Sequence, residues 1–384
     1  MATLLFITTK KTWGGSEPLW CDTAERALAV GHRVTIAMPT PEKLHSRHEK
    51  LAEMGAKIIF KAPWAKPTLL RRVVLKLRRI KRPEAKWWRD HLPEKTDAIC
   101  ISQGGTYCAM NMPGLVPWLF DSGIPYLLVC QSNRAYALPS FQMRRDIQGL
   151  FRNAFKICFV AEENARAAAR FLAMDLPNAA VVQNPVNLRD TGIVPWSGDT
   201  KFRLACVARF EIRDKGQDLL LEALSRPAWK ERDFELSFFG NGPDGEIIQD
   251  LIGHYGLGEK VRVAGFEPDI RKVWAAHQML VLPSLSEGTP LSLIEAQVCG
   301  RPALVTRVDG NPDWVEEGKT GFLAEAPTVY HLRAALDRAW DKRYFWHEMG
   351  KAARDVCMAK RDPDHAGTLL KMLDMAASRT KTES

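Results

Sequence analysis

Short apolar runs alternate with amphipathic stretches along nearly the whole chain, and this alternation restricts the fold to a small set. Runs of three to five residues suit buried strands, whereas the stretches between them carry apolar residues at helical spacing. Strand–helix–strand repeats build parallel sheets, because each helix returns the chain to the same edge of the sheet. The runs form two series: Leu4–Ile7, Arg33–Ala37, Ala56–Phe60, Ala98–Ile101, Tyr126–Cys130 and Lys156–Val160, then Arg203–Val207, Leu236–Phe239, Val261–Val263, Met279–Leu282 and Ala303–Val305.

The two series predict an α/β protein made of two Rossmann-like domains. A chain of 384 residues is too long for one ordinary core. A polar, proline-containing stretch separates the series, so we expect an N-terminal Rossmann-like domain over 1–187 and a second Rossmann-like domain over 188–345. The helical residues 346–384 are expected to cross back to the first domain. Ligands bind at the carboxyl ends of parallel strands, so an interdomain cleft is the expected site.

Composition points to a globular protein of a reducing compartment. The chain is 46% hydrophobic and 26% charged, and no apolar stretch is long enough for a membrane span. The first residues suit a buried strand rather than a signal peptide. The eight cysteines include no C-x-x-C pair, which favours buried thiols in a cytoplasmic protein and argues against a zinc site or any other metal.

Positive charge is concentrated in the first half of the chain. Residues 1–195 contain 28 Lys and Arg against 16 Asp and Glu, whereas the remainder contains 26 against 29. Residues 66–89 hold ten basic residues and one acid, together with an apolar helical face and Trp87–Trp88. Three interpretations remain open: a peripheral helix on an anionic inner-membrane face, a site for an anionic or lipid-diphosphate acceptor, or a helix packed by its apolar side. No nucleic-acid recognition motif accompanies this charge.

Glu287 and Glu295 have seven residues between them, around a predicted strand-to-helix junction. Residues 279–283 suit a buried strand, and a helix is expected to begin near Pro290, since proline is tolerated in a first turn. Amides at the start of that helix would present donors to phosphate or sugar oxygens. Carboxylates on either side of these amides could accept hydrogen bonds from the hydroxyl groups of a nucleotide sugar.

This stretch resembles the signature of family 4 retaining glycosyltransferases of the GT-B fold, the glycosyl transferases group 1. Glu287, Gly288, Pro290, Glu295, Ala296, Gly300 and Pro302 match the family pattern. The resemblance implies that Glu287 holds the hexose hydroxyls and Glu295 the ribose. It further implies transfer with retention of configuration and without a metal or other cofactor. The leaving phosphate would then deprotonate the acceptor.

Arg209 and Lys215 follow the first strand of the second series. A guanidinium and an ammonium placed there can approach one diphosphate from two sides, while Gly216 allows close backbone approach. The segment resembles the family's Gly-Arg…Lys-Gly motif, with Ala208 in place of the first glycine. Both cations are therefore expected to act in catalysis by stabilising the negative charge of the leaving diphosphate. Glu287 is the third expected catalytic residue.

Glycine turns after other strands complete the expected donor site, and Gln131 is a candidate for the acceptor or sugar site. Many relatives carry histidine where this chain has Gln131, and a glutamine amide cannot act as a base. The turn at Gly265 and Phe266 matches the place where family members meet the nucleotide base. The expected donor-binding residues are Gly14, Gly15, Gly265, Phe266, Gly288, Thr289, Pro290, Leu291 and Glu295.

The sequence therefore favours a retaining hexosyltransferase that uses a nucleotide sugar, with UDP-sugars favoured and GDP-sugars as the alternative. The implied acceptor is a glycan or a lipid-linked saccharide of cell-envelope or polysaccharide biosynthesis. A nucleotide-sugar epimerase or hydrolase could share this architecture, and a noncatalytic nucleotide-sugar-binding protein could retain the glutamate pair. The dinucleotide fingerprint of Rossmann oxidoreductases is absent from the sequence.

Overall fold

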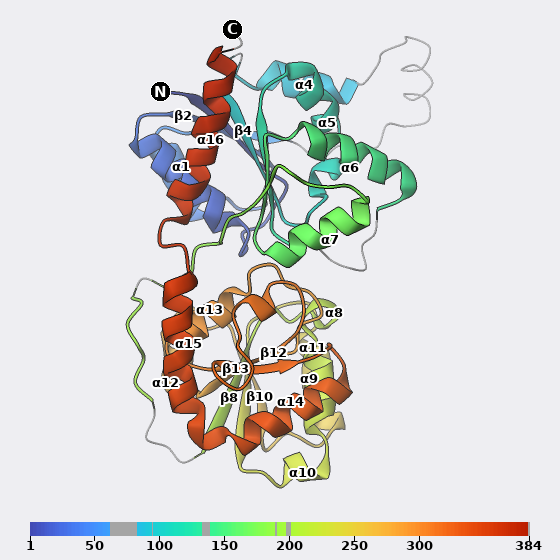
Figure 1. Cartoon of the computed structure of the whole chain (residues 1–384), viewed down its shortest axis with the longest axis vertical. Coiled ribbons are helices and arrows are strands. Elements are labelled where there is room, and N and C mark those ends of the chain that lie inside the picture. The colour runs from blue at the N-terminus through green and yellow to red at the C-terminus, as the bar shows by residue number, and fades with distance from the viewer. Residues whose placement is uncertain (62–82, 94, 133–138, 189, 197–200, 383–384) are drawn as a thin grey trace. The chain divides into compact units, whose positions relative to one another are not determined.

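The computed structural model describes residues 1–61, 83–93, 95–132, 139–188, 190–196 and 201–382. The chain divides into two compact units (Figure 1), Met1–Pro185 with Pro363–Ser384, and Val186–Asp362. Each unit is built on one parallel sheet, which confirms the predicted α/β class and the two Rossmann-like halves. The first unit changes to the second between Pro185 and Val186, two residues before the expected boundary.

The first unit contains a seven-stranded sheet in the order β3-β2-β1-β4-β5-β6-β7. Its strand order reverses between β1 and β4, so loops leaving these two strands meet at the carboxyl edge. The strands are β1 (Thr3–Thr8), β2 (Arg33–Pro39), β3 (Lys57–Lys61), β4 (Ala98–Gln103), β5 (Tyr126–Cys130), β6 (Lys156–Phe159) and β7 (Ala179–Val181).

Helices cover both faces of this sheet, which explains why β1, β4 and β5 are buried along their whole length. Leu4 and Phe6 of β1 belong to one buried cluster, and Leu5 and Ile7 belong to another. The helices are α1 (Glu17–Ala29), α2 (Ser46–Glu53), α4 (Pro83–His91), α5 (Leu115–Ser122), α6 (Phe141–Asn153), α7 (Glu162–Leu172), α16 (His365–Thr382) and the 3-10 helix η1 (Cys108–Asn111).

The crossing back to the first unit begins at Pro363, later than the expected residue 346. Helix α15 (Trp346–Lys360) stays in the second unit because it buries Trp346, Met349 and Cys357 there. Helix α16 alone joins the first unit, where it lies along α1 (Figure 1) and buries Leu369 and Leu373. Helix α16 thus belongs to the first unit and helix α15 to the second, whereas the sequence led us to expect all of 346–384 to cross back.

The second unit contains a six-stranded sheet in the order β10-β9-β8-β11-β12-β13. Its order reverses between β8 and β11, so the loops after these strands define the switch point of this sheet. The strands are β8 (Phe202–Val207), β9 (Phe234–Phe239), β10 (Val261–Gly265), β11 (Met279–Leu282), β12 (Ala303–Thr306) and β13 (Gly321–Ala324).

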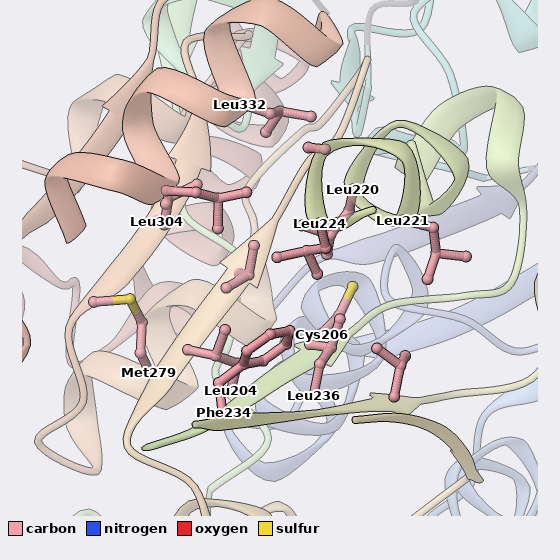
Figure 2. Packing of buried hydrophobic residues seen from close by; sticks show 14 of the residues in the cluster. Leu204, Cys206, Leu220, Leu221, Leu224, Phe234, Leu236, Met279, Leu304 and Leu332 are labelled. Carbon is pink, nitrogen blue, oxygen red and sulfur yellow. The ribbon is translucent and has the colours of Figure 1, made fainter. Parts of the chain in front are cut away.

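Alternate residues of β8 again supply two cores. Leu204 and Cys206 face the leucines of α9 (Figure 2), whereas Ala205 lies in the cluster on the opposite face. The remaining elements are α8 (Ile212–Lys215), α9 (Gln217–Leu224), α10 (Pro227–Lys230), α11 (Gly245–His254), α12 (Ile270–Ala276), α13 (Leu291–Val298), α14 (Val329–Asp341) and the 3-10 helices η2 (Asn311–Asp313) and η3 (Arg343–Phe345).

Most of the basic segment 66–89 lies outside the described residues, so its three interpretations stay open. Its last part forms α4, where Trp88 is fully buried and donates a hydrogen bond to the Pro113 carbonyl at 2.9 Å. The Lys61 ammonium lies 4.0 Å from the Trp88 ring, a cation–π contact within the core. The Trp88 ring also stacks on the ring of Trp118 in α5, with 5.9 Å between the ring centroids. Among the described helices, none combines the length and hydrophobicity needed to cross a membrane.

Candidate functional site

The connections after β8 and β11 bring all three predicted catalytic residues, Glu287, Arg209 and Lys215, to the carboxyl edge of the second sheet. Gly216 has φ of +63°, and a Cβ there would lie 2.3 Å from the Pro283 carbonyl oxygen. Only glycine therefore allows the α8–α9 junction to approach the end of β11 so closely. The Leu285 amide then donates to the Asp214 carbonyl at 2.8 Å, which ties the loop after β11 to the loop after β8.

This approach places the Lys215 ammonium 2.8 Å from Oε1 of Glu287. The Ser284 hydroxyl donates to the same oxygen at 2.6 Å. The side chains of Lys215 and Glu287 are 20% and 10% exposed, so the ion pair is largely shielded from water. Two predicted catalytic residues, 72 positions apart, are thus in direct contact. A cation and a carboxylate side by side can bind a phosphate and a sugar hydroxyl at adjacent positions.

Arg209 lies on the same loop but is much more exposed. Its guanidinium pairs with Glu211 at 2.7 Å, and its side chain is 63% exposed. Its carbonyl accepts a hydrogen bond from the buried Gln217 amide at 2.7 Å, so the backbone is fixed while the side chain reaches solvent. The structure thus places Arg209 and Lys215 at the two ends of one short loop.

Glu295 is a buried carboxyl group on α13. The helix begins at Leu291 with Pro290 as its N-cap, where the sequence predicted it, and no side chain caps its first amides. Glu295 is 8% exposed, and burial raises its pKa to about 7. The Asn187 backbone amide donates a hydrogen bond to it, which favours the ionised form and opposes part of this rise in pKa. A hydroxyl group of a ligand could donate a further hydrogen bond to this carboxylate and replace part of the hydration that burial removes.

The other predicted donor-binding residues of this unit lie on the loops after β10 and β11. Gly288 is partly exposed and Thr289 is buried, directly before α13. Gly265 has φ of +78°, and its carbonyl accepts from the Gly240 amide at 2.9 Å. Phe266 is 70% exposed, which leaves its ring open to a planar partner.

Gly14, Gly15 and Gln131 lie at the carboxyl edge of the first sheet, in the other unit. The two glycines are exposed and directly precede α1. The Gln131 amide nitrogen donates to the Ser16 carbonyl at 3.4 Å, and its oxygen accepts from the Asn184 amide at 2.6 Å. Gln131 therefore connects the loop that contains Gly14 and Gly15 to the segment just before Pro185.

The sequence analysis missed Asp309, Ser284 and the role of the Asn187 amide. Asp309 accepts from the backbone amide of Glu287 at 2.7 Å. The Asp309–Gly310 pair is a turn signal after a strand, and this signal could have marked the residue. No pattern could have connected it to Glu287, 22 residues earlier. Among the residues that the structure describes, no group of three His, Cys, Asp or Glu is arranged to hold a metal ion.

One protein-family profile matches a region within the second unit. The profile of the family described as Glycosyl transferases group 1 matches residues 196–356. An Escherichia coli UDP-Gal:alpha-D-GlcNAc-diphosphoundecaprenol alpha-1,3-galactosyltransferase is 36% identical over 104 residues, 26% of this chain and 27% of that enzyme. The Bacillus anthracis N-acetyl-alpha-D-glucosaminyl L-malate synthase is 33% identical over 125 residues, 33% of each chain. The matched region thus spans about a third or less of the length of these two relatives.

Solved structures resemble nearly the whole chain. Alr3699/HepE of Anabaena, crystallised with UDP, has a TM-score of 0.73 at 16% identity and covers 98% of this chain and 100% of its own. The lipopolysaccharide outer core galactosyltransferase WaaB has a TM-score of 0.71 at 16% identity, covering 97% and 99%. These similarities show the GT-B fold.

Proposed function

We propose that the chain is a retaining glycosyltransferase that moves a hexose from a nucleotide sugar to a glycan or lipid-linked acceptor. The contact between Lys215 and Glu287 at the switch point of the second sheet carries this proposal. Lys215, with Arg209 from the same loop, would bind the diphosphate and stabilise the charge of the leaving group. Both described contacts to the Glu287 carboxylate fall on Oε1, so a sugar hydroxyl would donate to Oε2.

Glu295 would accept hydrogen bonds from the ribose of the donor. Burial disfavours its negative charge, and two hydroxyl donors would compensate for part of the lost hydration. The uncapped amides at the start of α13 would face the phosphate or sugar oxygens. Phe266 and the Gly265 backbone would meet the base. We favour UDP as the nucleotide because a structural neighbour, Alr3699/HepE of Anabaena, was crystallised with it.

From the first unit, Gly14 and Gly15 would bind the donor, and Gln131 would contribute to the acceptor or sugar site. Two matched relatives support a saccharide acceptor of cell-envelope or polysaccharide biosynthesis, one named for a diphosphoundecaprenol-linked substrate and one as a putative colanic acid biosynthesis glycosyltransferase, WcaL of Salmonella typhimurium. A metal-independent reaction, a cytoplasmic location and membrane contact through 66–89 stay predictions.

Ligand-induced thermal shifts test the donor site first. Wild type, Glu295→Gln and the exposed control Glu246→Gln are heated with UDP, GDP, ADP and their hexose conjugates, without added metal. We expect one nucleotide to stabilise wild type and Glu246→Gln, and the Glu295→Gln shift to shrink as affinity falls by about tenfold. Stabilisation by none of these nucleotides would refute the proposed donor site.

Incubation of the bound UDP- or GDP-hexose then separates transfer from the other activities. Release of free sugar in the absence of an acceptor would indicate a hydrolase, and an isomerised donor would indicate an epimerase. Donor binding with neither product, in the presence of saccharide acceptors, would indicate a binding protein. The coupling constant of the new anomeric proton reports whether the configuration is retained.

A further inference from the structure

We propose that Asp309 is a positioning residue that holds the Glu287 loop in its working geometry. Asp309 lies in the loop after β12, and its Oδ2 accepts from the Glu287 amide at 2.7 Å and from the Ser286 hydroxyl at 3.1 Å. One carboxylate oxygen therefore fixes two consecutive residues of the turn that carries Glu287. The catalytic consequence rests on the proposed function, whereas the positioning itself can be tested without it.

The backbone of Asp309 is strained in a way that points to this role. Its φ is +44°, in the left-handed region that residues with a side chain rarely adopt. Ala173 is the one other such residue in the described ranges, and it follows α7, where a left-handed residue is an ordinary helix ending. Asp309 ends no helix. Its strained backbone instead directs its carboxylate toward the turn that carries Glu287. Strained residues are often found at functional sites.

The loop after β11 is otherwise held through contacts with its neighbours. The Thr306 hydroxyl donates to the Ser284 carbonyl at 2.5 Å, while Ser284 and Lys215 hold the Glu287 carboxylate. Asp309 is the described partner of the Glu287 backbone amide. Because Glu287 is buried, this amide would lose its hydrogen bond without gaining ready access to water if Asp309 were removed. The turn would then loosen and Glu287 would move relative to Lys215.

Two substitutions at Asp309 separate its carboxylate from its backbone strain. Asp309→Gly adopts a positive φ freely but removes the acceptor, whereas Asp309→Asn keeps an oxygen and tolerates the left-handed region. Ala173→Gly is the matched control, since it relieves the same kind of strain far from the loop in sequence. We expect faster amide hydrogen exchange of the peptide 284–290 in Asp309→Gly, and exchange near that of wild type in the other two variants.

Turnover supplies the functional readout. UDP release from UDP-glucose and UDP-galactose is measured with the full-length chain and a saccharide acceptor mixture. We expect Asp309→Gly to lower kcat by about 100-fold, as a displaced catalytic group does, with donor KM changed by less than about threefold. Asp309→Asn should restore kcat to within about tenfold of wild type.

The two readouts distinguish failure of this inference from failure of the proposed function. Unchanged exchange of 284–290 in Asp309→Gly overturns the inference, whatever the turnover. Faster exchange with unchanged kcat also overturns it, because the position of Glu287 would then not matter. If wild type binds no nucleotide, the proposed function fails, and the exchange result alone decides whether Asp309 positions the loop.

Discussion

Replacement of Glu295 by glutamine should stabilise the protein, and increasingly so as the pH rises. The reason is that burial raises the pKa of Glu295 to about 7 from an ordinary value of 4.5. The folded protein therefore keeps a proton that the unfolded chain has already lost between these two pH values. For a group whose pKa is raised on folding, stability is greatest below the unfolded pKa and is lost as the pH rises through the folded pKa.

The size of the effect follows from the two pKa values. One pKa unit corresponds to about 1.4 kcal/mol, so the raised pKa of Glu295 lowers the free energy of unfolding by about 3 kcal/mol at pH 8 and by about 1 kcal/mol at pH 5. Glutamine has nearly the same shape and can accept the hydrogen bond from the Asn187 amide, but it has no charge to bury. For a unit of this size, about 3 kcal/mol corresponds to a rise in Tm of about 6–12 °C.

Thermal unfolding of wild type and Glu295→Gln at pH 5 and pH 8 measures this difference directly. Other carboxyl groups titrate equally in both proteins. The difference in stability between wild type and Glu295→Gln therefore changes with pH only through Glu295. Glu246→Gln, an exposed substitution, should change stability by less than about 0.5 kcal/mol at either pH. A gap between wild type and Glu295→Gln that is the same at both pH values would show that Glu295 is not held in a desolvated site.

Two further substitutions test the second unit. Arg301→Met should destabilise the protein by at least about 3 kcal/mol in chemical denaturation, because the buried guanidinium donates to the carbonyls of several separate segments. Its control Arg307→Met, at a half-exposed ion pair, should cost less than about 1 kcal/mol; equal losses would contradict this. Lys215→Met should lower kcat/KM for the donor by about 10²–10³-fold, whereas Lys319→Met at a surface pair should leave it unchanged.

The parts of the fold that the sequence predicted are those with strong local signals. The strand over Met279–Leu282 has the predicted bounds, because four consecutive apolar residues end at a proline. Helix α13 follows at Leu291 because Pro290 restricts the backbone in a way that suits a helix start. The alternation of such elements was sufficient for the sheet class, since parallel strands need crossover helices.

Two strands escaped the sequence analysis because tertiary contacts form them. Strand β7 is the short segment Ala179–Val181, which belongs to neither series of predicted strands and which pairs with β6 at the sheet edge. Strand β13 begins with Gly321, where a Cβ would lie 2.1 Å from the Ala303 carbonyl oxygen. Its pairing with β12 thus depends on a close approach that local propensity does not show.

The candidate site also contains some residues that local sequence patterns identify and others that only tertiary contacts reveal. Glu287, Glu295 and Lys215 could be identified because each belongs to a short pattern of residue types. Asp309 could not, since its contact with the Glu287 amide joins the ends of two neighbouring strands. The partners of Gln131 were equally hidden, because Asn184 lies 53 residues further along the chain.

The Lys215–Glu287 ion pair explains why such a site should favour the whole nucleotide sugar over the nucleotide alone. In the proposed function, a diphosphate bound to Lys215 would compete with Glu287 for the ammonium, and the buried carboxylate would then lose part of the compensation for its lost hydration. Hydroxyl groups of a hexose would restore this compensation by donating to Glu287, so diphosphate and sugar would stabilise each other in the site. With Ser284 on the carboxylate and Asp309 on the backbone, Glu287 is already held in place for those hydroxyls.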